Sequence, residues 1–128
     1  MIDHIGLDVS DIVRSRAFYR KALEPLGYRI IQEIQPAPER PPTVVMFGVG
    51  DEPDFVIAKD KPPGPGNHVA FRAETRAQVD AFHAAALQAG GRDNGGPGIR
   101  RRYSPTYYAA FVFDPDGFNI EAVCHAAG

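Results

Sequence analysis

Two histidines and one glutamate stand where their side chains could hold a metal ion. His4 and His68 each lie on a segment with strand-like alternation, and Glu121 lies on another near the end of the chain. The aliphatic neighbours of all three point the other way, toward the predicted helices. Two imidazoles and one carboxylate suit a divalent transition metal and leave coordination positions open for water, substrate or dioxygen. We therefore expect His4, His68 and Glu121 to bind one divalent ion, either Zn, Ni, Mn or Fe.

An internal repeat brings the two histidines to equivalent positions. When the sequence is shifted by 64 residues, His4 falls on His68, and the segment AFYRKAL falls on AFHAAAL. One register holds from the first strand to the last, which chance similarity between two helices does not explain. Each half has the pattern strand, helix and three strands, and at about 60 residues neither would bury much surface alone. The sequence predicts an α+β fold in which two βαβββ modules form a cup-shaped, barrel-like sheet with the helices outside.

Glycine and proline are concentrated between the predicted elements. The stretches rich in these residues are 36–42, 62–66 and 90–98. The first half is expected to contain four strands, at 2–9, 28–34, 43–49 and 54–58. Ser10 is a candidate N-cap for the helix that follows the first strand. We expect a single domain over 1–128, with a first module at 1–61 and a second at 66–125.

The repeat also predicts three protein ligands instead of four. It maps Glu121 onto Ile57, an aliphatic residue, so the first module offers no second carboxylate. Three protein ligands favour a catalytic metal, because structural zinc sites are usually closed by four protein donors. We also assign Glu121 a catalytic role, as a base that acts after leaving the metal.

The segment Asp114–Gly117 predicts the register of the last two strands. Proline at the second position of a type I turn, followed by a glycine with positive φ, makes a three-residue hairpin loop. This register places Phe111 across from Glu121, whereas a two-residue loop would turn Tyr108 and Val112 inward. With the longer loop we expect an apolar pocket around the metal, formed by Tyr107, Phe111, Phe113 and Asn119 and by first-module counterparts Phe47, Phe55 and Ile57.

Three adjacent arginines at 100–102, followed by Tyr103, form a local charge cluster. One interpretation is a solvated loop. The other is a rim on which Arg101 and Tyr103 share a face and bind an anionic group of a substrate through bidentate hydrogen bonds.

Composition and charge exclude several classes of protein. The chain has 128 residues, is 44% hydrophobic and carries a formal net charge of −2. A near-neutral chain is not expected to have nucleic acid as its main partner, and no apolar run approaches the roughly 20 residues that span a bilayer. The single cysteine, Cys124, rules out an intrachain disulfide, and the acidic start does not resemble a signal peptide. We expect a cytoplasmic protein that binds a small-molecule substrate and neither nucleic acid nor membrane.

Three segments resemble the vicinal oxygen chelate superfamily of glyoxalase I, bleomycin and fosfomycin resistance proteins and extradiol dioxygenases. They are IDHIGLDVSDIVRSRAFYRKAL, NHVAFRAETRAQVDAFHAAALQAGG and the more specific ending FVFDPDGFNIEAV. The resemblance implies two modules curled around a divalent metal bound by His4, His68 and Glu121. In this family the cup closes within one chain or between two. Short chains of this kind usually pair, so we expect a homodimer.

The resemblance implies three alternative functions. The first is a metal-dependent enzyme of the glyoxalase type, a lyase or isomerase acting on a small oxygenated substrate chelated to the metal. Glyoxalase I usually has a fourth, carboxylate ligand where this chain has Ile57, and that difference favours the two-histidine, one-glutamate iron site of an extradiol-type dioxygenase. The third is a metal-free protein that sequesters a drug, as bleomycin resistance proteins do.

Overall fold

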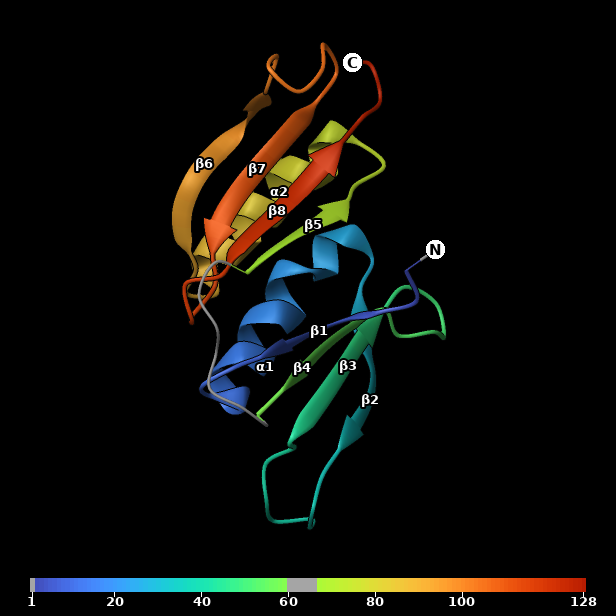
Figure 1. Ribbon diagram of the computed structural model, residues 1–128, viewed down its shortest axis with the longest axis vertical. Coiled ribbons are helices and arrows are strands. Elements are labelled where there is room, and N and C mark those ends of the chain that lie inside the picture. Colours follow the sequence, from blue (N-terminus) through green and yellow to red (C-terminus); the bar gives the residue numbers. More distant parts are fainter. Residues whose placement is uncertain (1, 60–66) are drawn as a thin grey trace.

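The computed structural model describes residues 2–59 and 67–128, which form two βαβββ modules (Figure 1). The first module contains β1 (Ile5–Asp8), α1 (Ile12–Ala22), the short 3-10 helix η1 (Glu24–Leu26), β2 (Arg29–Ile34), β3 (Val44–Gly48) and β4 (Phe55–Ala58). The second contains β5 (His68–Arg72), α2 (Arg76–Gln88), β6 (Arg92–Ile99), β7 (Tyr108–Phe113) and β8 (Asn119–Cys124). The predicted α+β fold class is confirmed, although the described strands do not close into a barrel. The predicted module ends at 61 and 66 lie outside the described residues.

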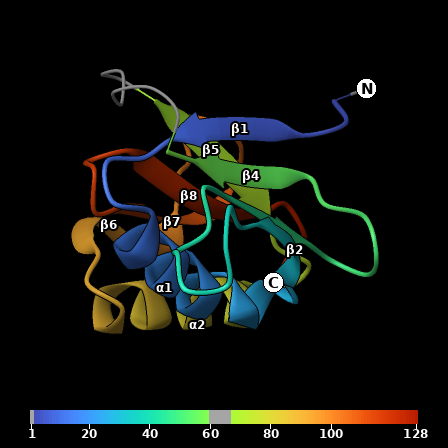
Figure 2. The same cartoon turned by 90° about the horizontal axis from the view of Figure 1, so that it is seen from below.

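Each module has its own four-stranded sheet. The strand orders are β1-β4-β3-β2 and β5-β8-β7-β6, with a parallel pair at β1–β4 and at β5–β8. Both helices lie on the same side of the strands, so the opposite side of each sheet is open (Figure 2). No helix in the described part of the chain is long and apolar enough to cross a membrane.

The modules are joined by helix packing and by aromatic side chains. Helix α1 packs against α2, and the ring of Phe55 lies 5.0 Å from that of Phe71 in the other module. Tyr19 of α1 is fully buried and donates its hydroxyl hydrogen to Asp114 at 2.5 Å. Burial, and after it the negative charge of Asp114, raise the pKa of Tyr19 well above its usual value. This hydrogen bond ties the first helix to the turn before β8.

Helix α1 begins one residue later than predicted. Asp11 is its N-cap and accepts a hydrogen bond from the backbone N–H of Arg14. Ser10, the predicted cap, donates from its backbone N–H and from its hydroxyl to Asp116 in the β7–β8 turn. Serine and aspartate cap helices about equally well, so the contact with the second module explains why the cap falls on Asp11.

The glycine-rich stretch at 90–98, expected to be a connection, largely forms strand β6. Its pairing with β7 shifts register between Asp93 and Gly95 and again between Gly95 and Gly98. As the edge strand of its sheet, β6 can accommodate glycine, proline and bulges that a central strand would not.

Candidate functional site

The open face of the second module brings His68 and Glu121 into contact. Parallel pairing of β5 and β8 sets His68 opposite Asn119 and Ala70 opposite Glu121. His68 Nδ1 lies 2.9 Å from the Asn119 carbonyl oxygen, and His68 Nε2 lies 3.1 Å from Glu121 Oε1. The Glu121 side chain is only 3% exposed. Two of the three predicted metal ligands therefore lie side by side, one of them buried.

The hydrogen bond to Asn119 assigns a proton on His68. A carbonyl oxygen only accepts, so Nδ1 carries a hydrogen and, in the neutral ring, Nε2 presents its lone pair toward Glu121. An ionised carboxylate also presents lone pairs, so the space between the two atoms requires a proton or a metal cation. This donor set, with its tautomer anchored by the backbone, fits a divalent metal that accepts imidazole and carboxylate ligands.

Tyr107 holds the second oxygen of Glu121. Its hydroxyl donates to Glu121 Oε2 at 2.5 Å. Burial, and after it the Glu121 carboxylate, raise the pKa of Tyr107 to about 12, so the phenol stays a donor at neutral pH. The Tyr107 ring also contacts the rings of Tyr103 and His125, at centroid distances of 5.0 and 5.3 Å. Tyr107 thus supplies a donor that a buried carboxylate needs and leaves Oε1 facing the histidine.

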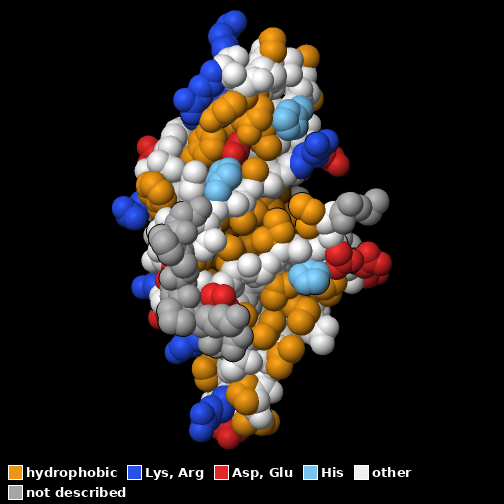
Figure 3. Space-filling view, viewed as in Figure 1, with side chains coloured by type: hydrophobic (Ala, Val, Ile, Leu, Met, Phe, Trp, Pro, Cys, Tyr) orange, Lys and Arg blue, Asp and Glu red, His pale blue; other side chains and the backbone are white. Residues whose placement is uncertain are grey.

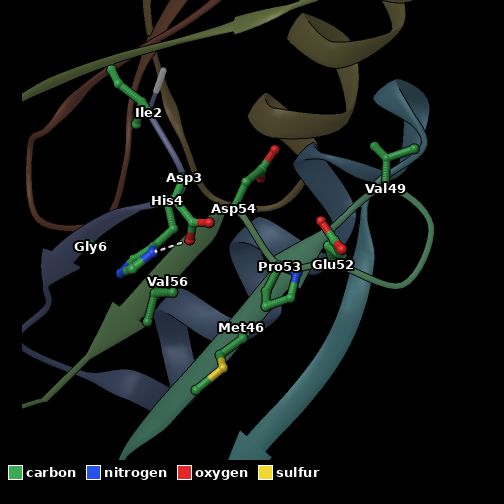
Figure 4. Close-up of a pocket in the computed structure, with 10 residues that line it drawn as sticks. All are labelled: Ile2, Asp3, His4, Gly6, Met46, Val49, Glu52, Pro53, Asp54 and Val56. Atoms are coloured by element: carbon green, nitrogen blue, oxygen red, sulfur yellow. Dashed lines mark hydrogen bonds and ion pairs between the residues drawn. The ribbon is translucent and has the colours of Figure 1, made fainter.

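His4 lies on the open face of the first module, at a hollow of about 850 Å³. Figure 4 shows His4, Val56 and Met46 on the same side of the sheet. The His4 side chain is 59% exposed, and its Nδ1 lies 2.7 Å from Asp3 Oδ1. Within 2–59 and 67–128, no three His, Cys, Asp or Glu side chains are grouped closely enough to hold a metal ion. A single chain therefore does not bring His4 to the other two predicted ligands.

Strand pairing corrects the first-module counterpart of Glu121. Gly6 pairs with Val56, and Ala70, which lies 64 residues after Gly6, pairs with Glu121. The counterpart is therefore Val56 and not Ile57, because the second module contains one extra residue before its last two strands. Val56 is also aliphatic, so the first module still offers no carboxylate at this position.

The prediction that Phe47, Phe55 and Ile57 face the open side is wrong. All three are at most 1% exposed and belong to the hydrophobic core, where the two phenylalanine rings lie 6.2 and 4.9 Å from a tyrosine ring of α1. Moving the register by one residue turns every side chain of a strand to the other face. The open face carries Met46 and Val56 instead.

The second-module residues of the predicted pocket lie on the open face. Phe111 pairs with Glu121, and Phe113 pairs with Asn119. The ring of Phe111 stacks near that of His68 with a centroid distance of 6.5 Å. The open-face positions of Phe111 and Phe113 follow from the predicted turn. Their role in substrate binding stays a prediction.

The arginine cluster lies in the turn after β6, and its members have different surroundings. Arg101 and Tyr103 are exposed. Arg100, which the alternation did not single out, places its guanidinium carbon 5.4 Å from the centre of the Phe111 ring. Arg92 stacks at 5.0 Å on the next open-face aromatic ring of β7. One sequence signal could have identified Arg100. It directly follows a glycine-rich stretch, and the next predicted strand is rich in aromatic residues.

The edges of the two open faces differ in charge. In Figure 3 hydrophobic and histidine side chains lie over both modules, and Lys and Arg side chains follow the β6 edge of the second. Acidic side chains gather at one edge of the first module, where Asp3, Glu52 and Asp54 line the hollow beside His4. The two faces are therefore complementary in charge at their edges.

The chain is similar to proteins of one family in sequence and in structure. It matches the family model described as Glyoxalase/Bleomycin resistance protein/Dioxygenase superfamily over residues 1–122. The crystal structure of a glyoxalase/bleomycin resistance protein from Albidiferax ferrireducens T118 is 29% identical, with a TM-score of 0.75, over 97% of this chain and 98% of that chain. A search of curated proteins found no match.

Two further solved structures share the fold at lower identity. A glyoxalase/bleomycin resistance protein/dioxygenase family enzyme from Burkholderia phytofirmans PsJN is 19% identical, with a TM-score of 0.69, over 98% of each chain. Lactoylglutathione lyase from Agrobacterium tumefaciens is 19% identical, with a TM-score of 0.67, over 96% of this chain and 92% of that chain. With the family model matched over 1–122, the chain belongs to the glyoxalase/bleomycin resistance protein/dioxygenase superfamily.

Proposed function

We propose that the protein is a metal-dependent enzyme of the glyoxalase type, a lyase or isomerase that acts on a small oxygenated substrate. In this proposal His68 and Glu121 of one chain and His4 of a second copy hold one divalent metal ion. The observation that carries it is the 3.1 Å contact of His68 Nε2 with the buried Glu121 carboxylate, while His68 Nδ1 is anchored on a carbonyl. Three ligands of this kind leave positions open for a substrate.

The second copy is the proposed source of the missing histidine. Both open faces lie on the same side of the chain (Figure 2), so a two-fold axis can lay the first module of each copy on the second module of the other. The acidic rim at Asp3 and Glu52 would then approach the basic β6 edge at Arg92, which stacks on Phe113. Charge complementarity and the apolar surface between the rims support a homodimer with two equivalent sites.

The chain's own residues suggest how the site would work. A bound divalent metal would supply two adjacent positions for neighbouring substrate oxygens and stabilise negative charge on them. Tyr107 holds Glu121 Oε2, so Oε1, after leaving the metal, would take a proton from the substrate carbon beside those oxygens. Phe111, beside His68, would limit access of water from the β7 side.

An extradiol-type dioxygenase is the second candidate. It is favoured by Val56, which stands at the counterpart of Glu121 and leaves two histidines and one glutamate as the ligand set. Such a set with open positions is typical of non-haem iron oxygenases. The metal that restores activity separates the candidates, because only the dioxygenase requires iron together with dioxygen.

Elemental analysis of protein purified without added metal tests the proposal. We expect about one divalent ion per chain in the wild type and its loss in His68→Ala and Glu121→Ala. His83→Ala is the matched control, because His83 bonds to Asp93 away from the site and should keep the metal. A wild type that holds no metal, and whose Tm does not change on adding Ni, Zn, Mn or Fe, would contradict the proposal and favour a metal-free binding protein.

We also propose the cytoplasm as the location of the protein. Cys124 is the only cysteine of the chain, so the chain has no pair for the intrachain disulfides common in oxidising compartments. Recovery of the native protein in a membrane or secreted fraction would contradict this proposal.

A further inference from the structure

Strand β6 makes room for the side chain of Arg100. The guanidinium folds back along the strand, and its Nη2 donates to the carbonyl of Gly96 at 2.7 Å. A Cβ atom at Gly95 would lie 3.2 Å from Arg100 Nη2, and one at Gly98 would lie 3.1 Å from Arg100 Nη1. Side chains at either position would crowd the guanidinium. The glycines of this edge strand therefore create the space that the arginine fills.

Within residues 2–59 and 67–128, the guanidinium of Arg100 has one hydrogen-bond partner, the carbonyl of Gly96. Its carbon lies 5.4 Å from the centre of the Phe111 ring, within the range of a cation–π contact. Gly96 accepts one of the five N–H donors that an arginine carries. Among the carboxylates of the described residues, none forms an ion pair with Arg100. An arginine that is held in place without a counter-charge is suited to bind an anion.

The guanidinium of Arg100 lies on the same sheet as the candidate metal ligands. The sheet order is β5-β8-β7-β6, and Glu121, Phe111 and Gly95 are paired in one row across β8, β7 and β6. On β5 this row continues with Ala70, and His68, two residues before it, reaches Glu121 with its ring. The Phe111 ring lies between the metal ligands and Arg100, 6.5 Å from the His68 ring and 5.4 Å from the guanidinium carbon. Because neighbouring strands lie about 4.8 Å apart, the guanidinium is about 10 Å from the strand of Glu121.

This spacing limits the size of a molecule that joins both ends. If the metal lies over the strand of Glu121, about 10 Å separate it from the guanidinium. A metal–oxygen bond takes about 2 Å of this distance and a hydrogen bond about 3 Å, so roughly 5 Å remain between the end oxygens of the molecule. That length corresponds to one six-membered ring or a chain of four to five atoms. The middle of such a molecule would lie over the Phe111 ring.

We propose that Arg100 binds a carboxylate of the substrate through paired hydrogen bonds. The substrates are then small anionic molecules with neighbouring oxygens at one end, a flat apolar middle and a carboxylate at the other end. Binding of the neighbouring oxygens rests on the proposed function. Binding of the carboxylate requires only Arg100 and the position of its guanidinium against β6.

An NMR titration of the metal-free protein with benzoate and benzamide tests the carboxylate end. The two probes have nearly the same shape, and only benzoate carries a charge. We expect benzoate to shift the backbone amide signals of Gly96 and Gly98 and to bind at least about fivefold more tightly than benzamide. Arg100→Gln should abolish that preference. Arg102→Gln removes the same charge two residues away, from an arginine stacked on Tyr103, and should keep the preference within about twofold.

Three results would overturn the proposal. They are no binding of benzoate, equal binding of benzoate and benzamide, and equal loss of the preference in Arg100→Gln and Arg102→Gln. The last result would mean that the probe responds to general positive charge. Unchanged amide spectra outside β6 and β7 would verify that both variants keep the fold.

The result of the titration does not depend on whether the proposed metal site exists. A protein that takes up no metal still reports on Arg100, because the titration uses metal-free protein. Normal metal loading together with a benzoate preference that survives Arg100→Gln would overturn the carboxylate site alone. Loss of that preference in a protein that never loads metal would support the carboxylate site and contradict the metal-dependent function.

Discussion

The open faces of the two modules share one framework and differ in chemistry. In each sheet a parallel pair of strands is followed by an antiparallel strand in the same register. His68 is the first residue of β5, and His4 directly precedes β1. Where the second module has Glu121, the first has Val56, and where the second has Phe111, the first has Met46. The repeat therefore keeps the backbone while only one copy carries a buried carboxylate.

That carboxylate explains the other differences between the faces. Glu121 is 2% exposed, and a charge so buried needs donors and a positive partner. The second module supplies Tyr107 as a donor and His68 as the neighbour that can share a cation. The first module has no buried charge to compensate at Val56 and offers one exposed imidazole beside a hollow with acidic and apolar lining. Two unlike halves of this kind can complete one another, whereas neither is complete alone.

Replacing Glu121 by valine would make the second face resemble the first, and we expect the largest effect from it. The Glu121→Val variant should bind Ni²⁺ or Zn²⁺ about 100-fold more weakly or worse, because it loses the only anionic ligand of the site. Isothermal titration of metal into stripped protein measures this loss. The His83→Ala variant should match the wild type, and wild-type affinity in Glu121→Val would rule out this carboxylate as a ligand.

The helices offer a second comparison, between Tyr19 and its counterpart His83. Tyr19 is fully buried and bonds to the buried Asp114, whereas His83 bonds to the largely exposed Asp93. We expect Tyr19→Phe to lower the free energy of unfolding by about 1–3 kcal/mol, because it leaves a buried carboxylate short of a donor. His83→Ala should cost less than about 1 kcal/mol. Urea denaturation of both variants at pH 7 compares them, and equal costs would contradict the expectation.

The same variant gives a pH dependence with a definite sign. Burial raises the pKa of Tyr19 above its unfolded value, so above about pH 10 the unfolded chain loses a proton that the folded chain keeps. The free energy of unfolding of the wild type therefore falls by about 1.4 kcal/mol more than that of Tyr19→Phe between pH 9 and pH 11. If the free energy of unfolding falls equally with rising pH in both proteins, the pKa of Tyr19 is not raised by folding.

Adding a carboxylate to the open face of the first module tests the comparison in the opposite direction. Val56→Glu places a carboxylate at the counterpart of Glu121 and beside His4 (Figure 4). In the proposed dimer this creates a fourth ligand, and we expect metal affinity to rise about tenfold. Val56→Gln has the same size without the charge and serves as the control. A rise of the same size in Val56→Gln, or no rise in Val56→Glu, would contradict a site shared by the two faces.

The smallest effect, on benzoate binding, is expected from the β6 glycines that surround the guanidinium of Arg100. In Gly98→Ala the new Cβ would lie 3.1 Å from Arg100 Nη1, whereas a Cβ at Gly96 would meet nothing within 4 Å. The guanidinium must move by a few tenths of an ångström, so benzoate should bind about two- to threefold more weakly to Gly98→Ala. Gly96→Ala should bind it like the wild type. Equal affinities for the two variants would show that the position of the guanidinium does not matter.

Most of the fold could be predicted because it depends on local patterns. Alternation along 2–9 identified β1, and Asp114–Gly117 predicted the register that sets Phe111 opposite Glu121. The capping residue was missed, because Ser10 is held by a residue more than a hundred positions away. Strand β6 was missed because its glycines lack strand propensity and are accommodated at a sheet edge.

The site could be predicted only where it depends on one module. His68 and Glu121 meet because both lie on paired strands of the same sheet. The pocket residues of the first module were misplaced because one extra residue in the second module shifts the repeat from 64 to 65, which turns Phe47 and Ile57 to the core. The place of His4 relative to Glu121 depends on how modules pack, and no pattern within a strand encodes that.

Subunit complementation tests most directly whether the metal site is shared between two chains. His4→Ala and His68→Ala each remove one ligand from every site of a homodimer, so neither variant alone should retain the metal. In a mixed dimer both substitutions fall in one site, and the other site keeps all three ligands. After equal amounts are mixed and the subunits exchanged, we expect metal content to return to about a quarter of the wild-type value. Metal content that stays at the level of the separate variants would contradict a site built from two chains.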